Sequence, residues 1–127
     1  MEQRTKAMRY FRSLLYAPGD QPRLIEEAAC SGADALIVDL EDRVPMDRKT
    51  EARSITRGYI ERLGKNSVIY VRVNSLASGM LREDLEAVIV DGLEGIRIPK
   101  VESPETVKAV DIVLSEVERA HGLPPGR

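Results

Sequence analysis

The sequence predicts an α/β fold in which the strands of a parallel sheet alternate with helices along the chain. Three observations support this fold class. A short apolar run, a polar cluster and an amphipathic stretch ending near glycine recur four times. The run at residues 35–40 is almost continuously apolar, as in a strand covered on both faces. The repeat of roughly 25 to 30 residues suits βα units joined by right-handed crossovers.

The first unit combines a strand expected over residues 12–17 with a helix that begins near Pro22. A proline suits the first turn of a helix, and Gly32 is expected to end this one as a C-cap. Cys30 is the single cysteine, which excludes an internal disulfide. We expect it to be a small buried residue rather than a nucleophile.

The second and third units follow the same pattern. After the strand at residues 35–40, Asp47 is expected to be the N-cap of a helix that ends at Gly64. A third strand is expected over residues 68–73, which are rich in β-branched residues. The helix after it should end near Gly92.

The fourth unit has the clearest helix start of the chain. Its strand is expected over residues 95–99, and Ser103 and Pro104 then supply a cap and a first-turn proline. The helix that follows should bury Val107 and end at Gly122, with His121 as a residue compatible with the helix dipole.

These repeats fit either an open doubly wound sheet or a closed barrel. The turn at residues 18–22 lacks a G-x-G-x-x-G phosphate loop, which disfavours a dinucleotide-binding sheet. A complete (β/α)₈ barrel needs about 250 residues, of which this chain would supply about half. We therefore expect residues 1–10 to be an N-terminal extension and residues 11–127 to be the N-terminal half of a barrel domain.

Composition excludes several classes of partner. The net charge of −2 gives no long-range attraction to nucleic acid or to an anionic membrane. No apolar stretch reaches the ~18 residues that span a bilayer, and the polar N-terminus lacks the apolar core of a signal peptide. We expect a cytoplasmic protein.

In both architectures the functional site lies at the carboxyl ends of the strands. Polar residues follow each expected strand there: Gly19 and Asp20; Asp39, Glu41 and Asp42; Arg72 and Asn74; and Lys100 with Glu102. Ordinary caps and turns would produce part of this pattern. Two residues are harder to explain in that way, because they interrupt apolar strands.

Arg72 lies inside an apolar strand and shares a face with Tyr70 and Asn74 by period-2 alternation. Facing the helix layer, its guanidinium would be buried without solvent, which is unfavourable. Facing inward near the mouth of a barrel, it could hold a carboxylate through two hydrogen bonds. A structural ion pair with Asp39 or Glu41 is the alternative. Asp39, in turn, could orient Arg72, hydrogen-bond a water or support a metal.

Lys100 follows the proline that ends the fourth strand. It could be a Schiff-base nucleophile, an anion ligand or an ion-pair partner for Glu102. Schiff-base chemistry is disfavoured, because the carboxylates of Asp39, Glu41 and Glu102 would hold the amine protonated.

Four ordered motifs resemble the HpcH/HpaI aldolase/citrate lyase superfamily, most closely its citrate lyase β-subunit-like branch. They lie at residues 12–19, 32–42, 71–74 and 98–102, so that the resemblance covers nearly all of the chain after residue 11. It implies a (β/α)₈ barrel, a homo-oligomer and Mg²⁺ as cofactor. It also implies cleavage or formation of a carbon–carbon bond beside a carbonyl, usually in a CoA thioester, with Mg²⁺ stabilising the developing enolate.

The resemblance also implies roles for individual residues. Arg72 and Asn74 match the strand-three motif, whose arginine contacts the substrate carboxylate or oxo group. Asp39, Glu41 and Asp42 match residues on the metal-water side of the site, Lys100 matches a pocket-floor position, and Arg12 matches a position near the CoA-binding mouth. Arg43 departs from the family, which usually has a small residue after the Leu-Glu-Asp motif. The two Mg²⁺ ligands, a Glu and an Asp after strands five and six, are expected beyond Arg127.

Three functional classes therefore remain. The first is a Mg²⁺-dependent lyase that cleaves a hydroxyacyl-CoA to an acyl-CoA and a 2-oxo acid, incomplete in this chain. The second is a class II aldolase acting on free 2-oxo acids. The third is a non-catalytic fragment or assembly module, which the expected absence of the metal ligands favours.

Overall fold

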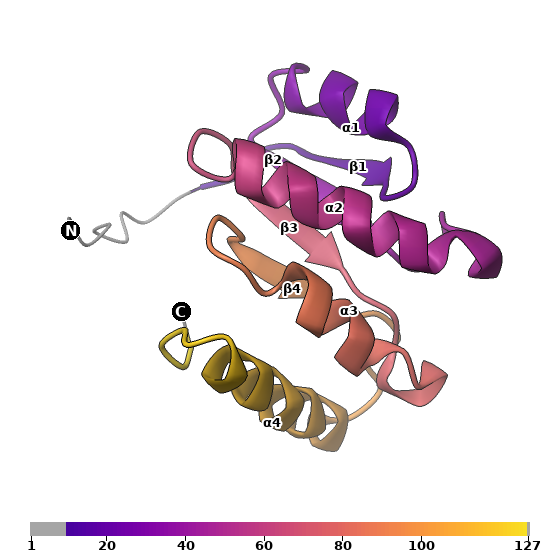
Figure 1. Ribbon diagram of the computed structural model, residues 1–127, viewed down its shortest axis with the longest axis vertical. Helices are drawn as coiled ribbons and strands as arrows, with labels where there is room; N and C mark the ends of the chain where they lie inside the picture. The colour runs from indigo at the N-terminus through magenta and orange to yellow at the C-terminus, as the bar shows by residue number, and fades with distance from the viewer. Residues whose placement is uncertain (1–9, 127) are drawn as a thin grey trace.

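The computed structural model describes residues 10–126, which form four consecutive βα units (Figure 1). The strands are β1 (Leu14–Pro18), β2 (Ala35–Asp39), β3 (Ile69–Arg72) and β4 (Gly95–Arg97). The helices are α1 (Pro22–Ala29), α2 (Lys49–Leu63), α3 (Leu81–Val88) and α4 (Pro104–Ala120), with short 3₁₀ turns at Met46–Arg48 and Leu76–Ser78. Residues 1–9 of the expected N-terminal extension lie outside the described residues, as does Arg127.

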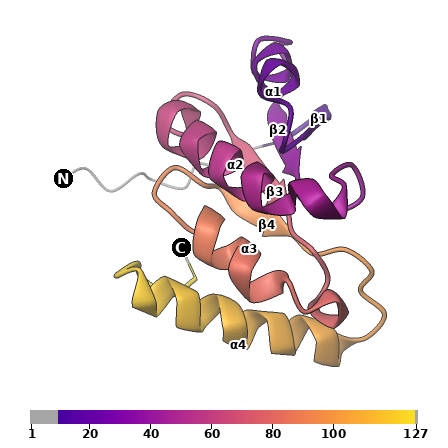
Figure 2. The same ribbon diagram turned by 45° about the vertical axis from the view of Figure 1, so that its right-hand side comes forward.

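The order of the strands distinguishes between the two architectures. All pairings are parallel, and the strands lie in the order β1-β2-β3-β4. A right-handed crossover that always moves to the next strand in the same direction places every helix on one face of the sheet. Figures 1 and 2 show the helices α1 to α4 gathered on one side of the strands. A doubly wound sheet has helices on both faces, so this is a segment of a (β/α)₈ barrel wall, and the predicted fold class is confirmed.

The two faces of the sheet differ in chemistry, because consecutive residues of a strand point to opposite sides. The helix-facing side chains are buried in one apolar core: Ala17, Leu36, Val38, Ile69 and Val71. The register aligns another set on the opposite face: Tyr16 with Ile37 and Tyr70, and Asp39 with Arg72 and Arg97. Charged side chains therefore occupy the C-terminal edge of the face that carries no helices.

Several helix ends agree with the sequence. Gly64 is the C-cap of α2. Ser103 caps α4, where its hydroxyl accepts a hydrogen bond from the backbone N–H of Thr106. His121 is the C-cap of α4, and its Nδ1 lies 2.7 Å from the carbonyl oxygen of Ile89. That contact ties the end of α4 to the segment after α3.

The start of α2 differs from the prediction that Asp47 is its N-cap. Asp47 lies within a 3₁₀ turn, which is closed by a hydrogen bond from the Arg48 N–H to the Pro45 carbonyl. The helix begins at Lys49 and has no side-chain cap. The extended conformation of Pro45 starts the turn early, so Asp47 is already inside it.

Three smaller predictions are also wrong. Helix α1 ends at Ala29, and Gly32 supplies the positive φ of +85° in the turn that follows the helix. Cys30 is exposed because it lies just beyond the last turn of α1. Val107 is 45% exposed, since α4 is the last described helix of the layer and packs on α3 along one side.

Within the described residues, no helix is both long and apolar enough to span a membrane.

Candidate functional site

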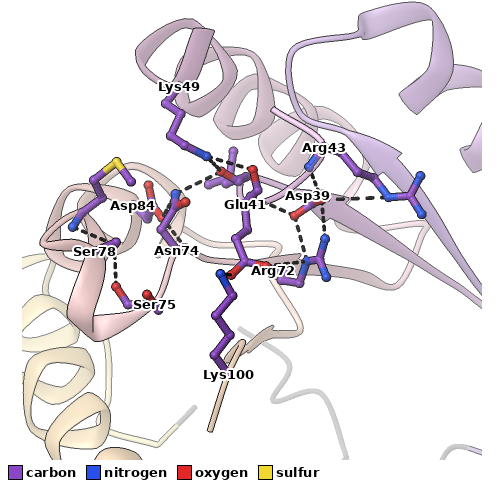
Figure 3. Close-up of polar contacts among 12 residues, drawn as sticks. Asp39, Glu41, Arg43, Lys49, Arg72, Asn74, Ser75, Ser78, Asp84 and Lys100 are labelled. Atoms are coloured by element: carbon purple, nitrogen blue, oxygen red, sulfur yellow. Dashed lines mark hydrogen bonds and ion pairs between the residues drawn. The ribbon is translucent and has the colours of Figure 1, made fainter. Parts of the chain in front are cut away.

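The C-terminal edge of the sheet brings together four of the predicted site residues: Asp39, Glu41, Arg72 and Lys100 (Figure 3). They come from the ends of β2, β3 and β4, which the parallel register places side by side. Parallel α/β folds place their functional sites at this edge. The predicted juxtaposition is therefore present, and its chemistry depends on how each group is paired.

Asp39 is completely buried, and its carboxylate is fully engaged. It accepts hydrogen bonds from Arg72 Nε at 2.9 Å and Nη2 at 2.6 Å, and from the backbone N–H groups of Glu41 at 2.8 Å and Arg43 at 3.0 Å. Burial by itself would raise the pKa of Asp39, but these bonds outweigh it and lower the pKa below its ordinary value. Asp39 therefore remains ionised and holds Arg72 in place.

Arg72 makes the ion pair that the sequence left open as an alternative to substrate binding. Its hydrogen bonds to Asp39 raise the pKa of the guanidinium, which stays charged. Nε and Nη2 face Asp39, but no acceptor among residues 10–126 hydrogen-bonds Nη1. The side chain is 22% exposed. The same arginine can therefore be fixed by Asp39 and still present free N–H donors to a ligand.

The carboxylate of Glu41 makes two ion pairs but accepts no hydrogen bond from a described residue. The residue is 7% exposed, with Oε1 3.7 Å from Arg72 Nε and Oε2 3.6 Å from Lys100 Nζ. Oε2 is buried and has no hydrogen-bond partner within the described residues. A buried carboxylate oxygen without a donor points to a water or ligand group at that position.

Lys100 has the only positive φ among the described non-glycine residues, +53°. This left-handed conformation is unfavourable for a residue with a Cβ and often occurs at functional sites. The side chain is 66% exposed and its amine approaches Glu41, not Glu102. An exposed ammonium beside a carboxylate agrees with the argument against Schiff-base chemistry.

Asn74 points away from Arg72, contrary to the simple alternation of the strand, because β3 ends at Arg72. Its Nδ2 donates to Asp84 Oδ2 at 2.7 Å and to the Leu40 carbonyl at 3.0 Å, and its backbone N–H also donates to Asp84 Oδ2, at 2.7 Å. Asp84 Oδ1 accepts from Arg53 Nε at 2.7 Å. This buried network fixes the end of β3 to α2 and α3. The substrate-binding role of Asn74 stays a prediction.

Lys49 supports the same edge from the helix side. It is 8% exposed, and Nζ donates to the carbonyl oxygens of Leu40 and Glu41, each at 2.8 Å. Burial lowers the pKa of its amine, although the carboxylates of Asp84, Asp39 and Glu41 counteract part of that effect. Sequence reasoning did not single out Lys49, Arg53 or Asp84 as site-building residues.

Two other predicted site residues are not part of the cluster. Arg12 precedes β1, at the opposite end of the sheet, where its backbone N–H donates to Asp34 Oδ2 at 2.6 Å. Five residues of strand at ~3.3 Å each separate the two ends. Asp42 is exposed on the segment after β2 and hydrogen-bonds no other described residue. Their substrate-binding roles remain predictions.

A metal ion would find one suitable group here. No group of three or more His, Cys, Asp or Glu side chains capable of holding a metal occurs among residues 10–126. Mg²⁺ is bound by oxygen ligands and keeps several of its waters. Both oxygens of Asp39 are used, whereas Glu41 Oε2 has a vacant acceptor position. The cluster is therefore better suited to hydrogen-bond a water molecule bound to such an ion than to coordinate the ion directly.

The fold and the candidate site together define a (β/α)₈-barrel segment with an anchored arginine and a buried carboxylate at the C-terminal edge of its strands. A family model for HpcH/HpaI aldolase/citrate lyase matches residues 12–125. The chain therefore belongs to this family, as its four motifs predicted.

Individual relatives agree with this assignment. The chain is 40% identical over 108 residues to a (3S)-malyl-CoA thioesterase of Cereibacter sphaeroides, covering 84% of this chain and 38% of the relative. It is 34% identical over 116 residues to the citrate lyase subunit beta of Escherichia coli K12, covering 91% and 38%. It thus spans less than half the length of these curated relatives.

Solved structures show the same pattern. Protein CitE from Mycobacterium tuberculosis, in complex with magnesium, acetoacetate and coenzyme A, matches with a TM-score of 0.61 and 32% identity, over 76% of this chain and 35% of that one. A Haloferax volcanii malate synthase matches with a TM-score of 0.81, over 95% and 40%, but at 21% identity it supports the fold alone.

Proposed function

We propose that this chain forms part of a Mg²⁺-dependent carbon–carbon lyase that cleaves a hydroxyacyl-CoA thioester to an acyl-CoA and a 2-oxo acid. The observation that carries the proposal is Arg72, which Asp39 holds in place while Nη1 remains available. A guanidinium fixed in this way can bind a substrate carboxylate or oxo group without losing side-chain freedom at that moment. Family membership supports the reaction class.

The other residues of the cluster would position the reacting groups. Asp39 keeps Arg72 charged and oriented, and Lys100 offers a second cation beside Glu41. Glu41 Oε2 can accept a hydrogen bond from a water or a substrate hydroxyl. We assign Asp42, Asn74 and Arg12 to substrate binding on the motif resemblance alone.

We infer Mg²⁺ as the cofactor from the magnesium-bound CitE relative. When bound, such an ion supplies positive charge that stabilises negative charge developing on a substrate oxygen. We place its direct ligands beyond Arg127. Within this chain, Glu41 would contribute by accepting a hydrogen bond from one of the ion's waters.

The test is a product assay on malyl-CoA and citramalyl-CoA with Mg²⁺ and with EDTA. Carbon–carbon cleavage releases a 2-oxo acid and leaves the thioester intact, whereas thioester hydrolysis releases a free thiol. We expect a 2-oxo acid from a protein that carries the complete barrel, and no turnover from the 127-residue chain alone. Release of free thiol only would instead support a thioesterase, the activity named for the Cereibacter relative.

A substitution at Arg72 connects the assay to the site. Arg72→Lys keeps the charge near Asp39 but loses the fork geometry, so kcat/KM should fall about 10- to 100-fold, as expected for one or two charged hydrogen bonds. Arg57→Lys is the control, because Arg57 is half-exposed on α2 and, among residues 10–126, pairs only with Glu61. Equal activity in both variants would contradict the proposed role of Arg72.

The two other functional classes are distinguished when free 2-oxo acid substrates are assayed beside the CoA thioesters. An aldolase would turn over free 2-oxo acids and ignore the CoA thioesters. A non-catalytic fragment or assembly module would be inactive on both, even when combined with a complementing half-barrel. We also propose, on the resemblance, that residues 11–127 are half of one barrel domain and that the protein is a cytoplasmic homo-oligomer, which size-exclusion chromatography with light scattering would test for assembly.

A further inference from the structure

Three arginines gather around one aromatic ring on the helix-free face of the sheet. The guanidinium carbons of Arg72, Arg43 and Arg97 lie 5.1, 5.4 and 5.9 Å from the ring centroid of Tyr16. Tyr16 belongs to β1, Arg72 to β3 and Arg97 to β4, while Arg43 follows β2. Residues far apart in sequence thus converge on one place, beside the candidate site.

Cations outnumber carboxylates in this arrangement. Asp39 neutralises Arg72 and reaches Arg43 only at 3.9 Å, and Glu41 is shared between Arg72 and Lys100. Arg97 pairs with no carboxylate of residues 10–126. The π-face of a tyrosine attracts cations, but it does not cancel the repulsion among several of them. An anionic ligand would remove that repulsion.

We propose that Arg43 and Arg97, seated on Tyr16, bind a second carboxylate group of the ligand whose first anionic group Arg72 holds. The site would then prefer dicarboxylic ligands over monocarboxylic ones. Guanidinium groups suit this task, because their planar fork matches a carboxylate. The inference rests on the proposed function only in taking Arg72 as the first anchor.

Succinate and butyrate test this preference, because they share a four-carbon skeleton and differ by one carboxylate. Affinities are measured by calorimetric titration of the purified protein, as the 127-residue chain or any longer chain containing it. We expect Arg43→Gln and Arg97→Gln each to weaken succinate binding about tenfold, the effect of one charged hydrogen bond. Butyrate binding should change less than about twofold. Circular dichroism verifies that each variant folds.

The matched control is Arg57→Gln, since Arg57 is half-exposed like Arg43 but lies on α2, among the helices. Succinate binding should be unchanged in this variant. The inference is overturned if the wild-type protein does not bind succinate, or if Arg43→Gln and Arg97→Gln leave its affinity unaltered. Equal losses for succinate and butyrate would overturn it as well. An Arg97 that pairs with a carboxylate elsewhere in a longer chain would give an unaltered affinity.

Arg72→Lys separates this inference from the proposed function. If Arg72 is the first anchor, this variant weakens both ligands, whatever happens at Arg43 and Arg97. If Arg72→Lys weakens ligand binding but Arg43→Gln and Arg97→Gln do not, only the proposed second carboxylate position is refuted. No loss with Arg72→Lys would count against the proposed function itself, and a preserved succinate preference would then rest on Arg43 and Arg97 alone.

Discussion

Asp84 provides the sharpest test of how the candidate site is supported. It is completely buried, and both of its carboxylate oxygens accept hydrogen bonds. Oδ1 accepts from Arg53 Nε, and Oδ2 accepts from the backbone and side-chain nitrogens of Asn74. In Asp84→Asn the shape is kept, but the new NH₂ group must face at least one of these donors. The substitution therefore removes a charge and creates a donor–donor contact.

The expected cost follows from burial. Breaking a buried ion pair by changing one partner typically costs about 3–5 kcal/mol. That is a large part of the roughly 5–15 kcal/mol that stabilises a domain. With a urea m-value of about 2 kcal/mol/M, the unfolding midpoint should fall by roughly 2 M while m stays constant. Far-UV circular dichroism during urea unfolding measures both quantities.

The matched control is a substitution of the neighbouring residue, Glu83. It contacts the same Arg53 at 3.3 Å, but its side chain is 67% exposed. Solvent screens such a pair, so Glu83→Gln should cost less than about 1 kcal/mol. If Asp84→Asn and Glu83→Gln lower the free energy of unfolding by the same small amount, the reasoning is refuted. Burial would then not determine how much each ion pair with Arg53 contributes to stability.

Two further predictions concern pH and backbone packing. Because the pKa of Asp39 is lowered in the folded state, its stabilising contribution is complete above the unfolded value of about 3.9 and is lost as pH falls further. The difference in unfolding free energy between wild type and Asp39→Asn should therefore be constant near pH 7 and shrink below about pH 4. Gly64→Ala would bring a Cβ into steric conflict with the Gly92 carbonyl oxygen and should lower the melting temperature by several degrees. Gly58→Ala, within the same helix but with open space around it, should raise the melting temperature slightly; a loss there like that of Gly64→Ala would contradict the argument from contacts.

The fold could be predicted from the sequence more completely than the site, for physical reasons. The βα repeat was visible in the sequence, because buried strands and amphipathic helices impose apolar periodicity. The Asp39–Arg72 pair was foreseeable as an alternative, since both charges interrupt apolar strands. The Arg53–Asp84 pair was not, because charged residues on helices usually face solvent. The available signal was that Asp84 lies within the apolar stripe of α3, between Leu81 and Leu85.

The pairing of the polar groups separates support from function. In the network of Arg53, Asp84 and Asn74, the hydrogen-bond donors and acceptors named above are used on one another, which fixes the strand ends but leaves little for a ligand. Beside this network, Arg72 has N–H donors and Glu41 has an acceptor that form no hydrogen bond with the described residues. Unused hydrogen-bonding capacity next to a rigid base is what a binding site requires, because the ligand then supplies the missing partners without reorganising the protein. This order of layers, rigid inside and unsatisfied outside, favours Arg72 and Glu41 as the groups that would bind a ligand, without reference to the family resemblance.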